Sequence, residues 1–337
     1  MLQMNIGPCG NAVFYVYFSR TTKATNQTTK TMNTIAWKGV MPAVTTKFTS
    51  EDQLDLPLFT KNIQAQLHAG VHGIILGGTL GEASTLSKAE KNTLILHTVK
   101  EVKGQVPVVI NIAEQTTKDA VTAAHAAQEA GAKGLMMLPP MRYKATSAET
   151  VAYFEAVASS TDLPIMIYNN PVDYGIEVTI PMFESLLKSP KIQAVKESTR
   201  DTTNVIRLQN AFGTRLNILS GVDTLALESL LLGAQGWVAG LVCAFPAETV
   251  AIYALAKAGR IKEATDLYKW FMPLLELDIN PQLVQNIKMA EVATKIGSEY
   301  VRLPRMPLQE PERSRVAQII TTALTNRPQL TDYKSLL

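Results

Sequence analysis

Residues 164–198, PIMIYNNPVDYGIEVTIPMFESLLKSPKIQAVKES, decide the fold that this chain predicts. The stretch holds two short apolar runs, residues 164–168 and 192–196, with a longer segment between them. Runs of this length that are apolar at successive positions are typical of strands buried on both faces. Two such strands joined by a long connection predict a parallel pair with a crossover helix.

The same unit repeats along the chain. Six further apolar runs lie at residues 39–44, 72–77, 107–112, 134–138, 216–220 and 236–242. The intervening segments are amphipathic or alanine-rich, and two of them end at Gly70 and Gly131, which suit a left-handed helix cap. Eight strand–helix units within roughly 200 residues predict a closed (β/α)₈ TIM barrel. An open doubly wound sheet also fits the alternation, but it gives no reason for the count to stop at eight.

After the eighth strand the sequence predicts only helices, of which the first closes the barrel and about three follow. We therefore assign residues 32–259 to the barrel and residues 260–337 to a C-terminal helical extension. No segment rich in Pro, Gly or Ser separates the two, so we expect the helices to dock on the barrel. Whether they cover its outside or serve assembly stays open.

Residues 1–31 are expected to be an extension of this domain, for example from an upstream start. They carry Arg20, Lys23 and Lys30 and no acidic residue, so the formal charge of +3 leaves 3 − 3 = 0 for the rest of the chain. Their apolar run, residues 12–18, is too short to span a bilayer. The charge follows this run, whereas a secretory signal needs charge before it. A targeting peptide is the alternative.

Several classes of function are not expected. Basic residues are scattered, which argues against nucleic-acid binding, and no apolar run is long enough for a membrane helix. The four histidines and two cysteines show no metal-ligand spacing, so we expect neither a metal nor an organic cofactor. With Cys9 in the extension, Cys243 has no internal partner, which favours a cytoplasmic location.

Two reactive side chains end neighbouring strands, where parallel barrels place their active sites. Lys196 follows a buried run, and desolvation would lower the pKa of its amine so that it can attack a ketone. Tyr168 ends the preceding strand and is placed to relay protons. The alternatives are that the Lys196 amine extends to solvent at the rim of the barrel or pairs with Glu197, and that Tyr168 only packs at the barrel mouth.

The turn after the second strand is rich in glycine, GGTLGE at residues 77–82. Backbone N–H groups around Gly78 and the hydroxyl of Thr79 are predicted to hold a carboxylate. Glycines also simply shape tight turns, and the turn does not match a phosphate-binding Walker loop.

In their order and spacing these pieces resemble the dihydrodipicolinate synthase and N-acetylneuraminate lyase family, from about Trp37 to Leu308. The matching motifs are GVMPAVTTKF, GGTLGEASTLS, YNNP, VKES and SGVDTLALESLLLGAQGWVAG. The resemblance implies that Lys196 forms a Schiff base with a 2-oxo acid and that Tyr168 shuttles protons. It also implies that Gly78 and Thr79 bind the carboxylate. A backbone carbonyl near Val238 is expected to face the substrate.

The chain departs from the lysine-biosynthetic synthase at three places. Leu80 replaces a residue that carries a hydroxyl. Arg142 stands where neighbouring subunits exchange a tyrosine, although Tyr143 is adjacent. Asp173 aligns with an arginine that grips the carboxylate of the aldehyde substrate, and an acid there would repel it. We therefore expect Asp173, Arg142 and Tyr143 to face a different substrate.

The resulting hypothesis is a Schiff-base lyase that dehydrates or deaminates a small 2-oxo acid or its cyclic imine. Hydroxy-pyrroline carboxylate and 2-keto-3-deoxy sugar acids are examples. The alternatives are 4-hydroxy-tetrahydrodipicolinate synthase, acting on pyruvate and aspartate semialdehyde, a retro-aldol lyase of the N-acetylneuraminate or keto-deoxy sugar acid type, and a catalytically silent 2-oxo acid sensor. The resemblance also implies a homotetramer built as a dimer of dimers.

Overall fold

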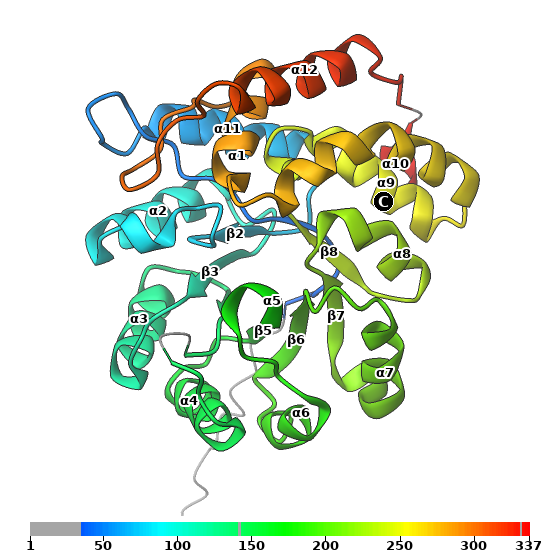
Figure 1. Cartoon of the computed structure of the whole chain (residues 1–337). Helices are drawn as coiled ribbons and strands as arrows, with labels where there is room; N and C mark the ends of the chain where they lie inside the picture. Colours follow the sequence, from blue (N-terminus) through cyan, green and yellow to red (C-terminus); the bar gives the residue numbers. More distant parts are fainter. Residues whose placement is uncertain (1–34, 141–142, 331) are drawn as a thin grey trace, which may run out of the picture. The chain divides into compact units, whose positions relative to one another are not determined.

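The structure is a computed structural model that describes residues 35–140, 143–330 and 332–337 (Figure 1). The predicted extension of residues 1–31 lies outside this range. Eight parallel strands pair in the order β1-β8-β7-β6-β5-β4-β3-β2. Their bounds are β1 Gly39–Pro42, β2 Ile74–Leu76, β3 Val108–Ile112, β4 Gly134–Met137, β5 Ile165–Asn169, β6 Ile192–Glu197, β7 Asn217–Ser220 and β8 Gly236–Ala239. All eight predicted strands are confirmed.

The ring of strands closes between β1 and β2. Ala43 forms a parallel bridge with Ile75, and the N–H of Val44 donates to the Ile75 carbonyl at 3.0 Å. Every residue of β2, β3, β4 and β5 is buried, because helices cover the outside and side chains fill the inside. The predicted (β/α)₈ barrel is therefore confirmed, and the open sheet is excluded.

Helices follow the strands in alternation. Their bounds are α1 Leu56–Ala69, α2 Lys88–Val102, α3 Thr117–Glu129, α4 Ser147–Ser160, α5 Pro171–Tyr174, α6 Ile180–Leu186, α7 Thr203–Phe212, α8 Ala226–Leu231, α9 Pro246–Lys257, α10 Ile261–Leu275, α11 Leu283–Ala293 and α12 Glu312–Thr325. Local signals set their ends: the Asp55 side chain accepts from the N–H of Leu58 at the start of α1, and Gly70 ends it with φ of 90°. Within the described ranges no helix has the length and apolarity needed to cross a membrane.

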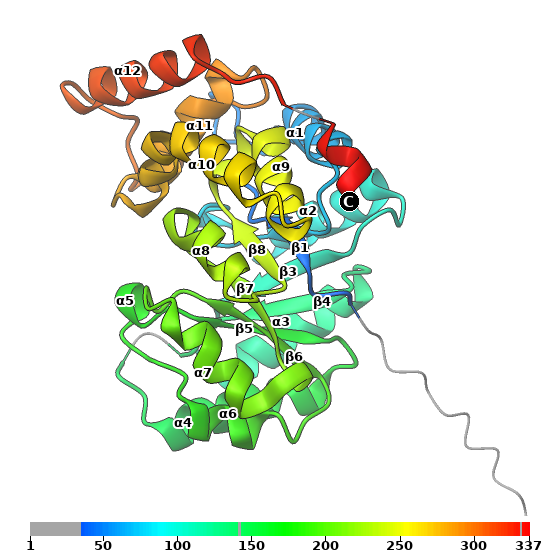
Figure 2. The ribbon, with the colours of Figure 1, turned by 90° about the vertical axis from the view of Figure 1, so that its right-hand side faces the viewer.

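The C-terminal helices α10, α11 and α12 dock on the barrel, as predicted. Helix α10 packs against α9, and α12 packs against both α10 and α11. Figure 2 shows the three together at the top of the view. They extend the barrel and do not form a separate lobe.

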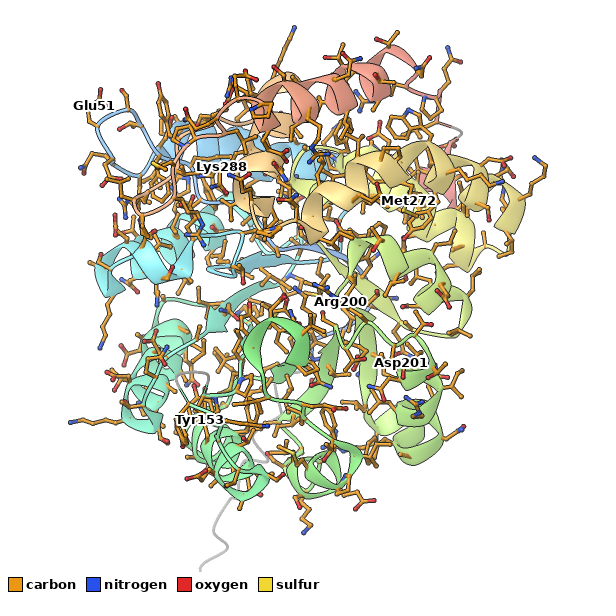
Figure 3. All side chains as sticks on the ribbon, in the orientation of Figure 1. Glu51, Tyr153, Arg200, Asp201, Met272 and Lys288 are labelled. Carbon is orange, nitrogen blue, oxygen red and sulfur yellow. The ribbon has the colours of Figure 1, made fainter. Side chains whose placement is uncertain are left out.

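Helix α11 is tied to loops that follow β1 and β2 by two buried ion pairs. Lys288 lies 2.6 Å from Glu82, and Glu291 lies 2.8 Å from Lys47, with all four side chains fully buried. Figure 3 labels Lys288 on α11. The Thr45 hydroxyl also donates to Glu291 at 2.6 Å. The extension therefore contacts the end of the barrel where the strands terminate, and it does more than cover the outer helices.

Candidate active site

A pocket opens at the C-terminal ends of the strands, with an empty volume of about 710 Å³ that includes its open mouth. Six of the predicted site residues line it: Gly78, Thr79, Tyr168, Asp173, Lys196 and Val238. The sequence prediction therefore brought together residues that the fold places in one cavity.

Lys196 is buried on β6, with 7% of its surface exposed. Its Nζ atom lies 4.0 Å from the centre of the Tyr168 ring. Burial lowers the pKa of the Lys196 amine, and the opposing charges of Tyr174, Asp278, Asp223 and Asp173 offset this in part. Because the side chain is buried, the amine does not reach the rim, and the Glu197 carboxylate bonds to Asn169, Thr199 and Asn204 instead of Lys196. A lysine with a lowered pKa is more readily neutral, and a neutral amine is a competent nucleophile.

Tyr168 is paired with Lys196 in the sheet, because β5 and β6 align these two residues. Its hydroxyl accepts a hydrogen bond from Nδ2 of Asn170 at 3.1 Å. Burial raises the pKa of Tyr168 to about 12, so the phenol keeps its proton near neutral pH. The side chain faces the amine and is placed to donate a proton to groups formed there.

Close packing shapes the glycine-rich turn after β2. A Cβ atom at Gly81 would lie 3.0 Å from the backbone nitrogen of Gly77 and 3.1 Å from the carbonyl oxygen of Val44. Gly77 itself has a φ of 61°, which favours glycine. The turn thus brings Gly78 and Thr79 to the pocket wall, where N–H groups and a hydroxyl suit a carboxylate.

The hydroxyl of Thr79 has a partner that the sequence reasoning missed. It lies 2.6 Å from the hydroxyl of Tyr174, the last residue of the short helix α5. The Tyr174 ring meets the Tyr168 ring edge to face, with centroids 5.6 Å apart. The motif Asn170-Pro171 does predict a helix start, since Asn170 caps the N–H of Asp173, but only the folded chain shows where Tyr174 points.

Asp223, between β7 and β8, organises the end of β8. Its carboxylate is fully buried and accepts from Trp237 Nε1 at 2.8 Å, from the Gly240 N–H at 3.1 Å and from the Leu241 N–H at 2.8 Å. Burial raises the pKa of Asp223, and these hydrogen bonds oppose the rise. This anchor fixes the backbone that follows Val238.

The mouth of the pocket carries charged groups that the barrel and the extension contribute together. Asp173 is exposed, accepts from Asn170 Nδ2 at 2.7 Å and lies 3.5 Å from a guanidinium nitrogen of Arg200. Arg200 appears near the middle of the view in Figure 3. Asp278, which the sequence reasoning also missed, comes from the 3₁₀ turn Glu276–Ile279 after α10 and lines the same pocket.

Tyr143 does not line this pocket, and the prediction for Arg142 is not tested. Tyr143 is 54% exposed at the surface, and Arg142 lies outside the described residues. A role of Tyr143 toward a neighbouring subunit stays a prediction. In the described part of the chain no group of His, Cys, Asp and Glu side chains is arranged to hold a metal ion.

In this (β/α)₈ barrel a desolvated lysine amine lies over a tyrosine ring at the ends of two adjacent strands. This arrangement defines a lyase of the lysine Schiff-base class. The Dihydrodipicolinate synthetase family matches residues 36–323. The chain belongs to this family, which confirms the resemblance inferred from its motifs.

Curated relatives carry the name 4-hydroxy-tetrahydrodipicolinate synthase. The protein from Exiguobacterium sibiricum is 32% identical over 289 residues, which cover 85% of this chain and 97% of that protein. The protein from Sorangium cellulosum is 31% identical over 292 residues, with 85% and 96% covered.

Solved structures agree with this assignment. Dihydrodipicolinate synthase from Aquifex aeolicus superposes with a TM-score of 0.82 at 25% identity, covering 88% of this chain and all of that one (100%). A prophage protein of the family from E. coli K12, solved in complex with pyruvate, gives a TM-score of 0.81 at 26% identity, with 86% and 99% covered.

Proposed function

We propose that this chain is a Schiff-base lyase that eliminates a hydroxyl or an amine from a small 2-oxo acid or its cyclic imine. The observation that carries the proposal is the Lys196 amine, buried 4.0 Å from the Tyr168 ring in a pocket that the acids Asp173 and Asp278 also line. The lysine and tyrosine support the class of reaction, and the acidic groups support the kind of substrate. We place the enzyme in the cytoplasm as a homotetramer, as its family resemblance suggests.

The first half of the reaction is formation of the Schiff base. The neutral Lys196 amine attacks C2 of the substrate, and the carbonyl oxygen takes up a proton to give a carbinolamine. Protonation of the carbinolamine hydroxyl by Tyr168 lets water leave, and the nitrogen lone pair forms the iminium. The turn at Gly78 and Thr79 holds the carboxylate on C1 and so fixes C2 beside the amine.

The second half uses the iminium as an electron sink. A proton leaves C3 to give an enamine, whose electrons then form a C3–C4 double bond as the hydroxyl or amine leaves C4. A hydroxyl departs as water and an amine as ammonia, so each takes up one proton. Hydrolysis then releases the product and restores Lys196.

Asp173 supports elimination over condensation with a second acidic substrate. A carboxylate at the pocket mouth repels a carboxylate and attracts a hydroxyl or a protonated nitrogen. The second candidate is 4-hydroxy-tetrahydrodipicolinate synthase, which the names of the relatives favour. Arg200, 3.5 Å from Asp173, is a cation that such a substrate would need.

Reductive trapping tests the Schiff base. With pyruvate and borohydride we expect the wild type to gain one adduct by intact mass, located on Lys196 by peptide mapping. Lys196→Arg should show none. Lys191→Arg, on a lysine that pairs with Asp162 at the start of β6, is the matched control and should label like the wild type. An unlabelled wild type would contradict the proposal and leave the sensor alternative.

Substrate assays decide between the two candidates. We expect turnover of 4,5-dihydroxy-2-oxopentanoate or of hydroxy-pyrroline carboxylate, with pyruvate and aspartate semialdehyde as the comparison. Faster condensation of the latter pair would show that the acidic pocket mouth does not exclude the synthase reaction.

A further inference from the structure

The C-terminal extension contributes a carboxyl group to the pocket of the barrel. Asp278 lies in the turn Glu276–Ile279, some forty residues beyond the last strand in sequence order. It lines the cavity that also holds Lys196 and Val238, and its side chain is half-buried. No motif of the barrel includes this residue, so it is an addition to the strand-end chemistry.

Asp278 is held against the end of β8. A Cβ atom at Gly240 would lie 2.2 Å from Oδ1 of Asp278 and 2.9 Å from a methyl carbon of Leu80. Glycine at position 240 therefore leaves the space that the carboxyl group occupies. The N–H of Gly240 donates to Asp223, which fixes this stretch of backbone. The carboxyl group therefore has a defined position beside Gly240, at the end of β8.

Asp278 differs from the other acids of the pocket because its carboxyl group has no hydrogen bond or ion pair with any residue that the structure describes. Asp223 accepts three N–H groups, and Asp173 contacts Asn170 and Arg200. Polar groups withdrawn from water are normally paired. A carboxyl group that lines a substrate pocket without a protein partner is available to the substrate.

The surroundings favour the protonated form of Asp278. Burial raises its pKa well above the ordinary value, and the negative charges of Asp223 and Asp173 raise it further. The positive charge of Lys196 opposes them. Arg200, which pairs with Asp173 at 3.5 Å, is a further charged group that lines this pocket. A protonated carboxyl group can donate a proton. Asp223 is not placed to do so because it accepts three N–H groups, and Asp173 is not because it pairs with Arg200.

Building on the proposed elimination, we propose that Asp278 is the catalytic acid that protonates the leaving group on C4 of the substrate. As the enamine electrons form the C3–C4 bond, the C4–O bond breaks and its electron pair takes the proton of Asp278, giving water and the Asp278 carboxylate. Tyr168, which lost its proton when water left the carbinolamine, takes up the proton from C3, and the proton released when water hydrolyses the iminium returns to Asp278, so the cycle is balanced. The carboxylate formed is stabilised by the iminium on Lys196.

A pair of leaving groups tests this role directly. The hydroxyl of 4,5-dihydroxy-2-oxopentanoate needs a proton to depart, whereas fluoride in 4-fluoro-5-hydroxy-2-oxopentanoate leaves without one. The variant is Asp278→Asn, which keeps the shape and removes the acid. Glu276→Gln, an exposed acid in the same turn, is the matched control.

We expect Asp278→Asn to lower kcat for the hydroxyl substrate by about 10²- to 10⁴-fold, the usual contribution of general acid catalysis. The rate with the fluoro substrate should change far less, and Glu276→Gln should behave as the wild type with both. Wild-type kcat should fall as the pH rises and Asp278 loses its proton. This fall should be absent in Asp278→Asn. Borohydride trapping with pyruvate should be retained, which shows that the variant is folded and forms the Schiff base.

Equal losses with the two substrates, or no loss with either, would overturn the role of Asp278 while leaving the Schiff-base function in place. A wild type that forms no adduct would overturn the proposed function and this role together. Gly240→Ala gives an independent check, because its methyl group would displace the Asp278 carboxyl group. It should reproduce the selective loss with the hydroxyl substrate.

Discussion

Replacing Lys288 by methionine tests how strongly the extension is bound to the barrel. The amine of Lys288 lies 2.6 Å from Glu82, donates to the Tyr300 carbonyl at 2.5 Å and lies 4.7 Å from the centre of the Phe48 ring. Methionine has a similar length and fills the space, so the change removes the charge and keeps most of the packing. Glu82 is then left in the interior without its main partner.

The expected loss follows from what remains around Glu82. Removing one partner of a buried ion pair costs about 3–5 kcal/mol, because the other charge stays desolvated. Glu82 keeps the N–H of Arg302 at 3.1 Å and the guanidinium of Arg305 at 3.9 Å. These contacts favour the lower end, about 3 kcal/mol, which is more than a hundredfold in the folding equilibrium at about 1.4 kcal/mol per factor of ten.

The assay is urea denaturation followed by circular dichroism. Lys262→Met is the matched control, since Lys262 pairs with Asp266 at the same 2.6 Å but is 88% exposed, and we expect it to leave the stability almost unchanged. The double variant Lys288→Met with Glu82→Gln should recover part of the loss, because no buried charge is left alone. Equal losses for Lys288→Met and Lys262→Met would refute the reasoning.

Two further changes probe the pH response and the site. The hydrogen bond from Arg302 lowers the pKa of Glu90 to about 2 from 4.5, so its contribution to stability is present above 4.5 and is lost as the pH falls toward 2. As the pH falls from 4.5 toward 2, Glu90→Gln should therefore lose less free energy of unfolding than the wild type, measured by urea denaturation at each pH. Parallel curves of this free energy against pH for the two proteins would contradict the prediction. Tyr174→Phe removes the partner of the Thr79 hydroxyl, and we expect KM for the 2-oxo acid to rise several-fold, for a hydrogen bond of about 1 kcal/mol, with trapping at Lys196 retained. An unchanged KM would show that the turn needs no such support.

The barrel could be predicted from the sequence because its signals are local. Each strand is a short apolar run, and helix ends such as Asp55 and Gly70 carry their own capping groups. Strand ends were predicted less well. The last run was expected to reach residue 242, but β8 ends at Ala239, because Asp223 binds the N–H groups of Gly240 and Leu241 in place of the sheet.

The site was predictable only as far as its residues follow strands. Lys196 and Tyr168 end β6 and β5, so the parallel register brings them together. Tyr174 and Asp278 reach the pocket through the path of a loop and of the extension, and no local pattern marks either. Asp278 in particular lies in LELDINPQ, which reads as the end of a helix. The contact depends on long-range packing that periodicity does not encode.

The two buried ion pairs on α11 also set an order for biosynthesis. They join residues 206 and 244 positions apart, so the loops after β1 and β2 leave the ribosome long before their partners. At about 5–20 residues per second the interval is on the order of ten seconds or more. Throughout it Lys47 and Glu82 must stay hydrated, since neither can be buried alone. The barrel mouth therefore matures last, and a nascent chain that stops short of α11 has Lys196 but lacks Leu283, which lines the pocket.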